Sequence, residues 1–228
     1  MVGAGTAWKD DPRLTVRLLP GKDPLRVVAD STLRTPITAA VLANGAAAGT
    51  VLAVTENAPA DRCAEAHSLG ATVLRLPANT KGRADLPSLL FELRALSVGS
   101  VLVEGGAALI TALLCDRLVT RLAVCVAPKI LGSGIEAVGD LGICDFSHTL
   151  RLTDTSVTAY GVNLVLDSRV EYTNYTPGTP KRLQNRYSAA RSKPAPSGSP
   201  HHARSSSAWR VSHLPKTMRC VFGLPLRP

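Results

Sequence analysis

The chain has 228 residues, and 45% of them are apolar, which is enough for a hydrophobic core in one domain or two small ones. The formal net charge is +9, but residues 173–228 carry ten Lys or Arg and no Asp or Glu, which leaves 16 basic and 17 acidic residues in residues 1–172. The near-neutral first part therefore excludes the interpretation of the whole chain as a basic nucleic-acid-binding domain.

In chain order, the sequence predicts an alternation of strands and helices. Residues 2–6 are typical of a strand that ends in a glycine turn, and residues 9–12 of a loop. Expected strands cover residues 14–17, 25–30, 50–55, 71–76, 100–103, 121–127, 149–157 and 163–170, and expected helices cover residues 60–69, 85–96 and 107–118. The alternation favours an α/β fold with a mostly parallel central sheet, helices on both faces and an antiparallel C-terminal strand pair.

The cysteines and the first residues bear on the cellular compartment. Five cysteines, an odd number with no C-x-x-C pair, indicate buried thiols in a reducing cytoplasm and no zinc site. Charged residues from Lys9 onward interrupt any signal peptide, and Gly45 lies inside the uncharged stretch 37–55 and divides it into pieces too short for a membrane span. We therefore expect a cytoplasmic protein without a metal site or a membrane anchor.

From residue 173 onward, Ser, Pro, Arg and Asn dominate, and hydrophobic periodicity disappears. Such a composition cannot bury enough apolar surface to offset the entropy lost on ordering. We expect one domain at residues 1–172 and a basic, disordered and dispensable tail at residues 173–228. Aromatic residues near arginines, such as Tyr187 and Trp209, could stack on nucleic-acid bases, but a solvated tail is the commoner outcome, so nucleic acid is not an expected partner.

Residues 100–110 carry the strongest signal for a ligand site. An apolar strand ends at Glu104, two glycines follow, and an alanine-rich helix begins. A strand, a glycine turn and a helix N-terminus form a common phosphate-binding arrangement, because glycine lets the backbone approach the ligand and the first helical N–H groups face the anion. A tight βα turn with a solvated Glu104 is the alternative, since Gly-Gly after a strand is common.

Five sequence blocks in a fixed order resemble the reductase domain of the riboflavin-biosynthesis deaminase–reductase, the RibD C-terminal family. They are VGAGT at 2–6, DDPRLTVR at 10–17, RVVADSTLRTP at 26–36, VLVEGG at 101–106 and APKILG at 127–132. The resemblance covers residues 2–172 and implies a dihydrofolate-reductase-like fold and a homodimer. It also implies that NADPH reduces the ribosyl group of 5-amino-6-(5-phosphoribosylamino)uracil to a ribityl group.

The resemblance implies site residues position by position. Leu14, Arg17 and Glu104 would contact the phosphorylated pyrimidine substrate, with the guanidinium of Arg17 on the phosphate and the carboxylate of Glu104 on pyrimidine donors. NADPH would contact Thr6, Asp10, Ser31, Gly106, Ala107, Ala108, Leu109, Ile110, Thr111 and Ala112. The resemblance assigns no catalytic residue.

The chain departs from the family pattern in several places. Trp8-Lys9 replaces a small apolar pair, and Thr120 stands where the family has an acid. The family's first strand and first helix have no counterpart, so we expect a domain truncated at its N-terminus, with unpaired strands and low stability. The zinc deaminase motifs H-x-E and P-C-x-x-C are also missing. A related reductase of another heterocycle, or an inactive remnant whose tail binds nucleic acid, are the alternative functions.

Overall fold

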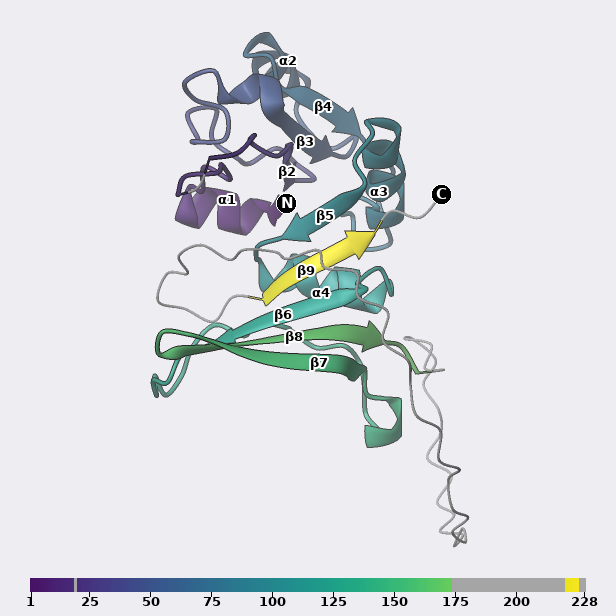
Figure 1. Ribbon diagram of the computed structural model, residues 1–228. Helices are drawn as coiled ribbons and strands as arrows, with labels where there is room; N and C mark the ends of the chain where they lie inside the picture. The colour runs from purple at the N-terminus through teal and green to yellow at the C-terminus, as the bar shows by residue number, and fades with distance from the viewer. Residues whose placement is uncertain (19, 174–219, 226–228) are drawn as a thin grey trace, which may run out of the picture.

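The computed structural model describes residues 1–18, 20–173 and 220–225 (Figure 1). A parallel sheet holds, in spatial order, β1 (Val2–Gly3), β2 (Arg26–Ala29), β3 (Thr50–Val54) and β4 (Thr72–Arg75). A second sheet holds, in spatial order, β5 (Ser100–Val103), β9 (Cys220–Pro225), β6 (Arg121–Val126), β8 (Asn163–Glu171) and β7 (Arg151–Tyr160). The helices are α1 (Ala4–Asp10), α2 (Ala60–Ser68), α3 (Leu86–Ala95) and α4 (Ala107–Cys115), with 3₁₀ turns η1 (Ala46–Gly49) and η2 (Phe146–His148).

The backbone of Met1 joins the two sheets. Its amino group donates to the carbonyl of Leu102 over 2.6 Å, and its carbonyl accepts from the N–H of Glu104 over 3.0 Å. Bonds to the residues on either side of Val103 are the pattern of a parallel ladder. The strand β5 therefore runs parallel to β1 and β2, and the carboxyl ends of these three strands meet at one edge of the molecule.

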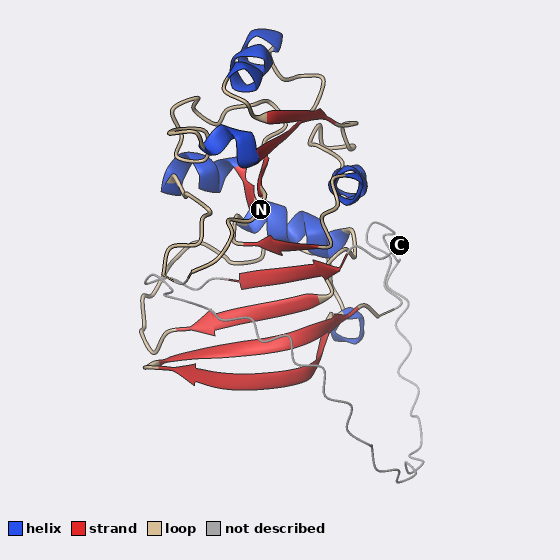
Figure 2. Cartoon of the chain, turned by 45° about the horizontal axis from the view of Figure 1, so that its top comes forward, coloured by secondary structure: helices blue, strands red, loops and turns tan. Residues whose placement is uncertain are grey.

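The hydrophobic core has two layers, one on each face of the parallel sheet. One layer contains Val27, Val51 and the buried leucines of α3 and α4. The other contains Val28 and Leu52, the next residues along β2 and β3, together with buried side chains of α1 and α2. Because successive strand residues point to opposite faces, this alternation puts two helices on each side of the sheet (Figure 2). It confirms the expected α/β fold with helices on both faces.

Local sequence signals account for several elements. Asp85 caps α3, its carboxylate accepting the N–H of Ser88 over 2.9 Å, and Pro87 lies in the first turn, as the sequence predicts. All five residues of β3 are buried, as expected of a strand covered on both faces. The expected antiparallel C-terminal pair is confirmed in β7 and β8, which pair from Arg151 with Glu171 to Tyr160 with Asn163.

Two expectations near the N-terminus are wrong. Residues 4–10 form α1, which covers part of the expected glycine turn and part of the expected loop. Alanines favour a helix here, and Ala7 packs into the core. Residues 14–17 form no strand. Leu14 has a φ of +52°, and the N–H of Val16 bonds the Asp23 carboxylate over 2.8 Å instead of a strand partner.

The strand β9 also differs from expectation. Most of the expected tail, residues 174–219 and 226–228, lies outside the described residues, but Cys220–Pro225 forms a strand between β5 and β6. Phe222 is in register with Val103 of β5 and with Leu122 of β6, and both pairings are antiparallel. The short apolar run CVFGLP has no periodicity to reveal a strand, and its partners lie about a hundred residues earlier. The facing edges of β5 and β6 are therefore paired rather than open.

Removal of β9 should destabilise the protein. A chain that ends at Arg219 would leave backbone groups of β5 and β6 unpaired, at about 1–3 kcal/mol for each buried group. We expect the melting temperature to fall by roughly 6–12 °C, the shift that corresponds to about 3 kcal/mol in a chain of this size. The control is a chain that ends at Pro225, which keeps β9 and should melt like the full chain. Equal melting temperatures for both shortened chains would show that β9 contributes nothing.

The amino group of Met1 should make stability depend on pH. Burial lowers its pKa from 8.0 to about 6, against the opposing effect of the Glu104 carboxylate. The unfolded chain then binds the proton more tightly, so the free energy of unfolding should fall as pH drops from 8 to 6, by on the order of 2 kcal/mol. Urea unfolding at both pH values measures this. A chain acetylated at Met1 has no amino group to protonate, so this part of the fall in unfolding free energy should be missing. Identical pH profiles for the free and acetylated forms would contradict the prediction.

Candidate functional site

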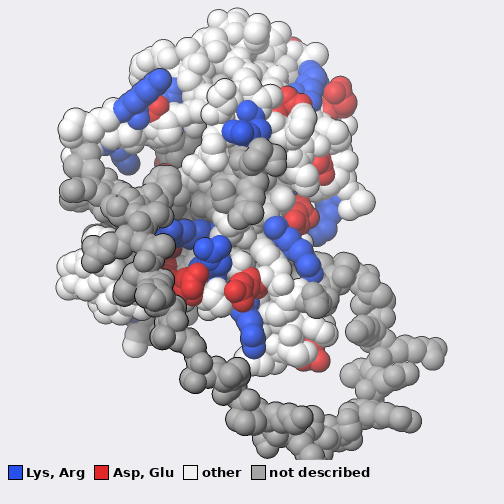
Figure 3. Space-filling model, turned by 45° about the vertical axis from the view of Figure 1, so that its right-hand side comes forward, with Lys and Arg blue, Asp and Glu red and all other residues white. Residues whose placement is uncertain are grey.

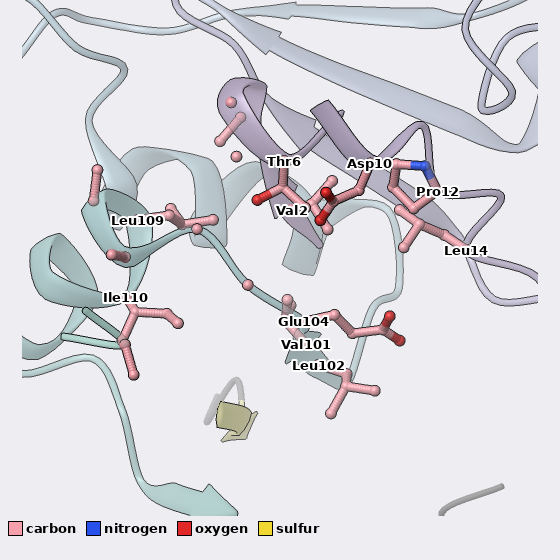
Figure 4. Close-up of a pocket in the computed structure, with 18 of the residues that line it drawn as sticks. Val2, Thr6, Asp10, Pro12, Leu14, Val101, Leu102, Glu104, Leu109 and Ile110 are labelled. Atoms are coloured by element: carbon pink, nitrogen blue, oxygen red, sulfur yellow. The ribbon is translucent and has the colours of Figure 1, made fainter. Parts of the chain in front are cut away.

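A cleft of about 2630 Å³ opens at the edge where the parallel strands end. Residues at or just after the carboxyl ends of β1, β2, β5 and β6 line it, namely Gly3, Asp30, Glu104 and Ala127. Figure 4 shows a close-up of a pocket here, with side chains of the N-terminal segment above those of β5 and α4. Open α/β sheets bind their ligands in this position.

The turn between β5 and α4 requires glycine. Gly105 has a φ of +143° and Gly106 a φ of +93°, conformations that L side chains rarely adopt. A Cβ on Gly106 would also lie 3.2 Å from the Oγ1 of Thr6. In the first turn of α4 the N–H of Leu109 bonds the Gly106 carbonyl over 2.9 Å, whereas the N–H groups of Ala107 and Ala108 precede the helical bonds. Ala107 and Ala108 line the cleft without bulky side chains. Backbone donors at this turn are thus open to an anionic ligand.

The helix α1 supplies the facing wall. Thr6 and Asp10 lie one helical turn apart on the same face, and both line the cleft, while Ala7 points into the core. Figure 4 shows Thr6 and Asp10 across the cleft from Leu109 and Ile110 of α4. Two elements that follow adjacent strands, α1 after β1 and α4 after β5, therefore enclose the glycine turn.

The half-buried Glu104 has no hydrogen bond or ion pair to its carboxylate from the residues that the structure describes. It lies in the cleft, on the same side as the half-buried Leu14 (Figure 4). Arg17 also lines the cleft and is exposed, without a carboxylate partner in the described part of the chain. The three expected substrate residues thus line one cleft, where the Glu104 carboxylate can accept hydrogen bonds and the Arg17 guanidinium can donate them.

Ser31 lies in the turn after β2 and is held from two sides. Its carbonyl accepts the N–H and the hydroxyl of Thr55 over 2.9 and 2.8 Å. Its Oγ accepts the N–H of Ala84 over 2.9 Å, which leaves the hydroxyl proton for another acceptor. Ser31 lines the same cleft as the glycine turn.

Thr111 is the one expected cofactor residue that does not line the cleft. Its hydroxyl donates to the Ala107 carbonyl over 2.6 Å and accepts the N–H of Gly139 over 2.8 Å. Its side chain therefore links the segment between β6 and η2 to α4. The other expected cofactor residues on α1, after β2 and in the segment 106–112 all line the cleft.

Sequence patterns missed several charged residues of the cleft. Arg34 follows Ser31 in the same turn. Arg83 belongs to a distant loop whose next residue, Ala84, donates its N–H to the hydroxyl of Ser31. Arg121 also lines the cleft, but both of its bonds to Asp167 measure 2.6 Å, and the hydrogen bond raises the pKa of Arg121. A local signal existed for Arg34 alone, as part of the block RVVADSTLRTP.

Charge on the surface is mixed. On the face in Figure 3, Lys and Arg alternate with Asp and Glu and form no single basic patch. Among residues 1–18, 20–173 and 220–225, no three His, Cys, Asp or Glu side chains are grouped so that they could hold a metal ion. Within that same part of the chain, no helix is long and apolar enough to cross a membrane.

The fold and the site define an α/β protein with a ligand cleft at the carboxyl edge of its parallel strands. Residues 1–166 match the family described as the RibD C-terminal domain, and the chain belongs to this family. It is 36% identical over 167 residues to the riboflavin biosynthesis protein RibD of Aquifex aeolicus, covering 73% of this chain and 44% of that protein. The chain thus spans less than half of this relative.

A second relative is matched over most of its length. The 2,5-diamino-6-ribosylamino-4(3H)-pyrimidinone 5′-phosphate reductase of Methanothermobacter thermautotrophicus is 38% identical over 179 residues, which cover 76% of this chain and 78% of the relative. Among solved structures, RibD of Acinetobacter baumannii aligns with a TM-score of 0.63 and 26% identity over 75% of this chain and 46% of that one. The yeast reductase Rib7 aligns with a TM-score of 0.57 and 22% identity, over 75% of this chain and 74% of Rib7, and shares the fold.

The same substitution at two glycines should have opposite effects. Gly106→Ala places a Cβ against Thr6 in a strained conformation, so we expect the free energy of unfolding to fall by about 1–3 kcal/mol. In Gly5→Ala the new Cβ meets nothing within 4 Å on α1, so stability should stay level or rise by up to about 1 kcal/mol. Urea denaturation of both variants measures the difference, and a Gly106→Ala protein as stable as the parent would refute the requirement for glycine.

Proposed function

We propose that the chain uses NADPH to reduce the ribosyl group of a ribosylaminopyrimidine 5′-phosphate to a ribityl group. One observation carries the proposal: the carboxylate of Glu104, which has no hydrogen bond or ion pair in the described part of the chain, lies directly before the positive-φ glycine turn, in the cleft that Thr6, Asp10 and Ser31 also line. Membership of the RibD C-terminal family and the names of its reductase relatives support it.

The residues of the turn fit a dinucleotide cofactor. Gly106 carries no side chain, and its φ of +93° and the nearby Thr6 hydroxyl disfavour one, so the backbone meets the ligand. The helix N-terminus favours the charge of a pyrophosphate. We assign the pyrophosphate to residues 106–110 and Ala112, and further cofactor contacts to Thr6, Asp10 and Ser31. Bound NADPH supplies the hydride; the chain orients the cofactor and excludes water.

The substrate would lie on the Glu104 side of the cleft. A carboxylate only accepts hydrogen bonds, and a pyrimidine with amino and ring N–H groups offers donors to it. The guanidinium of Arg17 suits the 5′-phosphate, because it presents a fork of donors to phosphate oxygens. Leu14 would add apolar contact with the pyrimidine. These contacts fix the substrate at both ends and leave the ribosyl carbon between them.

Two pyrimidines are candidates. The family resemblance favours 5-amino-6-(5-phosphoribosylamino)uracil, while the relatives named 2,5-diamino-6-ribosylamino-4(3H)-pyrimidinone 5′-phosphate reductase favour the compound with an amino group in place of the 2-oxo group. Incubation of the protein with NADPH and each compound, followed by the loss of reduced nicotinamide absorbance and identification of the ribityl product, tests the proposal. Turnover of either compound supports it and identifies the substrate. The proposal would be refuted if the protein reduced neither compound and did not bind NADPH.

Substitutions at the two polar substrate positions should separate substrate from cofactor. Arg17→Ala and Glu104→Gln should each raise the Michaelis constant for the pyrimidine phosphate by about tenfold or more, the value of one charge-assisted hydrogen bond. The dissociation constant for NADPH should stay within about twofold. Arg94→Ala on α3 and Glu65→Gln on α2, which do not line the cleft, are the matched controls. If either variant bound NADPH more weakly but kept the parent's Michaelis constant for the pyrimidine phosphate, that residue would belong to the cofactor site and not to the substrate site.

A further inference from the structure

The segment after β6 presents three large aliphatic side chains to solvent. Ile130 is fully exposed, Leu131 and Ile135 are 82% and 83% exposed, and all three line the cleft. A single exposed aliphatic side chain is ordinary on a protein surface, but a group of them beside a ligand cleft is typical of a contact surface. Their hydration favours any movement that covers them.

We call residues 127–139 the strap, and both of its ends are anchored. Ala127 directly follows the last residue of β6. At the other end, the N–H of Gly139 bonds the Oγ1 of Thr111 on α4 over 2.8 Å. Ala137 and Val138 pack against the core layer that holds the leucines of α3 and α4. The ends of the strap therefore keep their places whatever its middle does.

The middle of the strap is held loosely. Residues 130–138 form no helix or strand, and they neither donate nor accept a hydrogen bond within the part of the chain that the structure describes. Gly132 has a φ of +83°, and a Cβ on it would meet nothing within 4 Å. A backbone without hydrogen bonds opens at little free-energy cost, and glycine tolerates large changes of φ and ψ. The middle can therefore move between fixed ends.

One anchor lies beside the turn that carries Glu104, and the other lies directly after it. The strands β5 and β6 both run antiparallel to β9, which lies between them, so they end at the same edge, about 10 Å apart (Figure 1). The helix α4 begins just after Glu104 and the two glycines. The apolar side chains of the strap thus share the cleft with Glu104 and Arg17. Inward movement of the strap would cover a ligand held there.

The reaction proposed above needs such a cover. The ring-opened substrate has a C=N bond between the sugar carbon and the nitrogen attached to the pyrimidine. Reduction adds the hydride of NADPH to this carbon and a proton to the nitrogen, which gives the ribityl amine. Attack of water on the same carbon breaks the C–N bond instead, and it releases the aminopyrimidine and the free sugar phosphate with its aldehyde. Exclusion of water therefore determines the product as well as the rate.

We propose that the strap closes over the bound substrate and that Ile130, Leu131 and Ile135 keep water from its C=N carbon. This proposal rests on the proposed function and adds the residues that protect the reacting bond. Closure moves three aliphatic side chains from water onto the ligand, which supplies its driving force. Because both ends are anchored, the movement is confined to the middle of the strap, and the open form lets ligands enter and leave.

The distribution of products tests the strap. The full chain, in excess over 5-amino-6-(5-phosphoribosylamino)uracil or its 2-amino counterpart, whichever it reduces, is quenched after one turnover with NADPH. Ile130→Ser, Leu131→Ser and Ile135→Ser should each raise the share of free sugar phosphate by about tenfold, the equivalent of one apolar side chain lost from the closed form. Phe91→Ser on α3 and Val162→Ser between β7 and β8 change exposed apolar residues outside the cleft and should keep the parent's distribution.

Hydrogen–deuterium exchange measures closure independently of turnover. The amide groups of residues 130–138 should exchange fast in the free protein and with NADPH alone, because they have no hydrogen bonds there. With NADPH and the ribityl product both bound, their exchange should slow by about tenfold or more. The affinity of the three strap variants for NADPH should stay within about twofold of the parent's.

The outcomes separate the strap from the proposed function. A larger share of free sugar phosphate in the strap variants, with slower exchange of the strap in the ternary complex, supports closure. Normal reduction with an unchanged share in all three variants overturns the strap alone and leaves the reductase proposal standing. An equal rise in the two control variants, or exchange that stays fast in the ternary complex, also overturns it. A parent chain that reduces neither pyrimidine refutes the reductase proposal and the strap together.

Discussion

The backbone bonds of Met1 to β5 are the constraint on which the site depends. They put β5 next to β1, parallel to it, although a hundred residues separate the two strands in the chain. Parallel neighbours end at the same edge. Glu104 therefore emerges beside Gly3, at the start of α1, and one strand further along lies the turn with Ser31. A different neighbour for β5 would separate the glycine turn from the expected ligand contacts on α1 and after β2.

The close approach of α1 and α4 follows from the same pairing. Leu109 of α4 lies 3.5 Å from where a Cβ on Gly3 would be, and Thr6 of α1 lies 3.2 Å from the corresponding point on Gly106. The helix α4 thus packs against Gly3 of β1, and α1 packs against Gly106 in the turn before α4. A Cβ on Gly3 would fit at ordinary contact distance, whereas one on Gly106 would press on Thr6, so it is the bare Gly106 that lets α1 approach the glycine turn where a pyrophosphate is expected.

Local patterns predicted most of the fold, and long-range contacts explain what they missed. Asp85 and its helix, the buried strand β3 and the hairpin of β7 and β8 follow from residues adjacent in sequence. The strand β9 does not, because its partners in β5 and β6 lie far along the chain. In the site, Glu104 and Gly106 carry a local strand–glycine–helix signal. The loop of Arg83 is attached to the cleft by the hydrogen bond of Ala84 to Ser31, 53 residues earlier, a long-range contact that no sequence pattern encodes.

The central claim is that one cofactor spans the ends of β2, β1 and β5. Hydrogen–deuterium exchange with and without NADPH tests it most directly, because it locates protection along the whole chain without presupposing a residue. The account predicts slower exchange in three separate segments at once: residues 30–35, residues 79–84 and residues 104–112. Protection confined to one of these segments, or centred on the hairpin of β7 and β8, would contradict it.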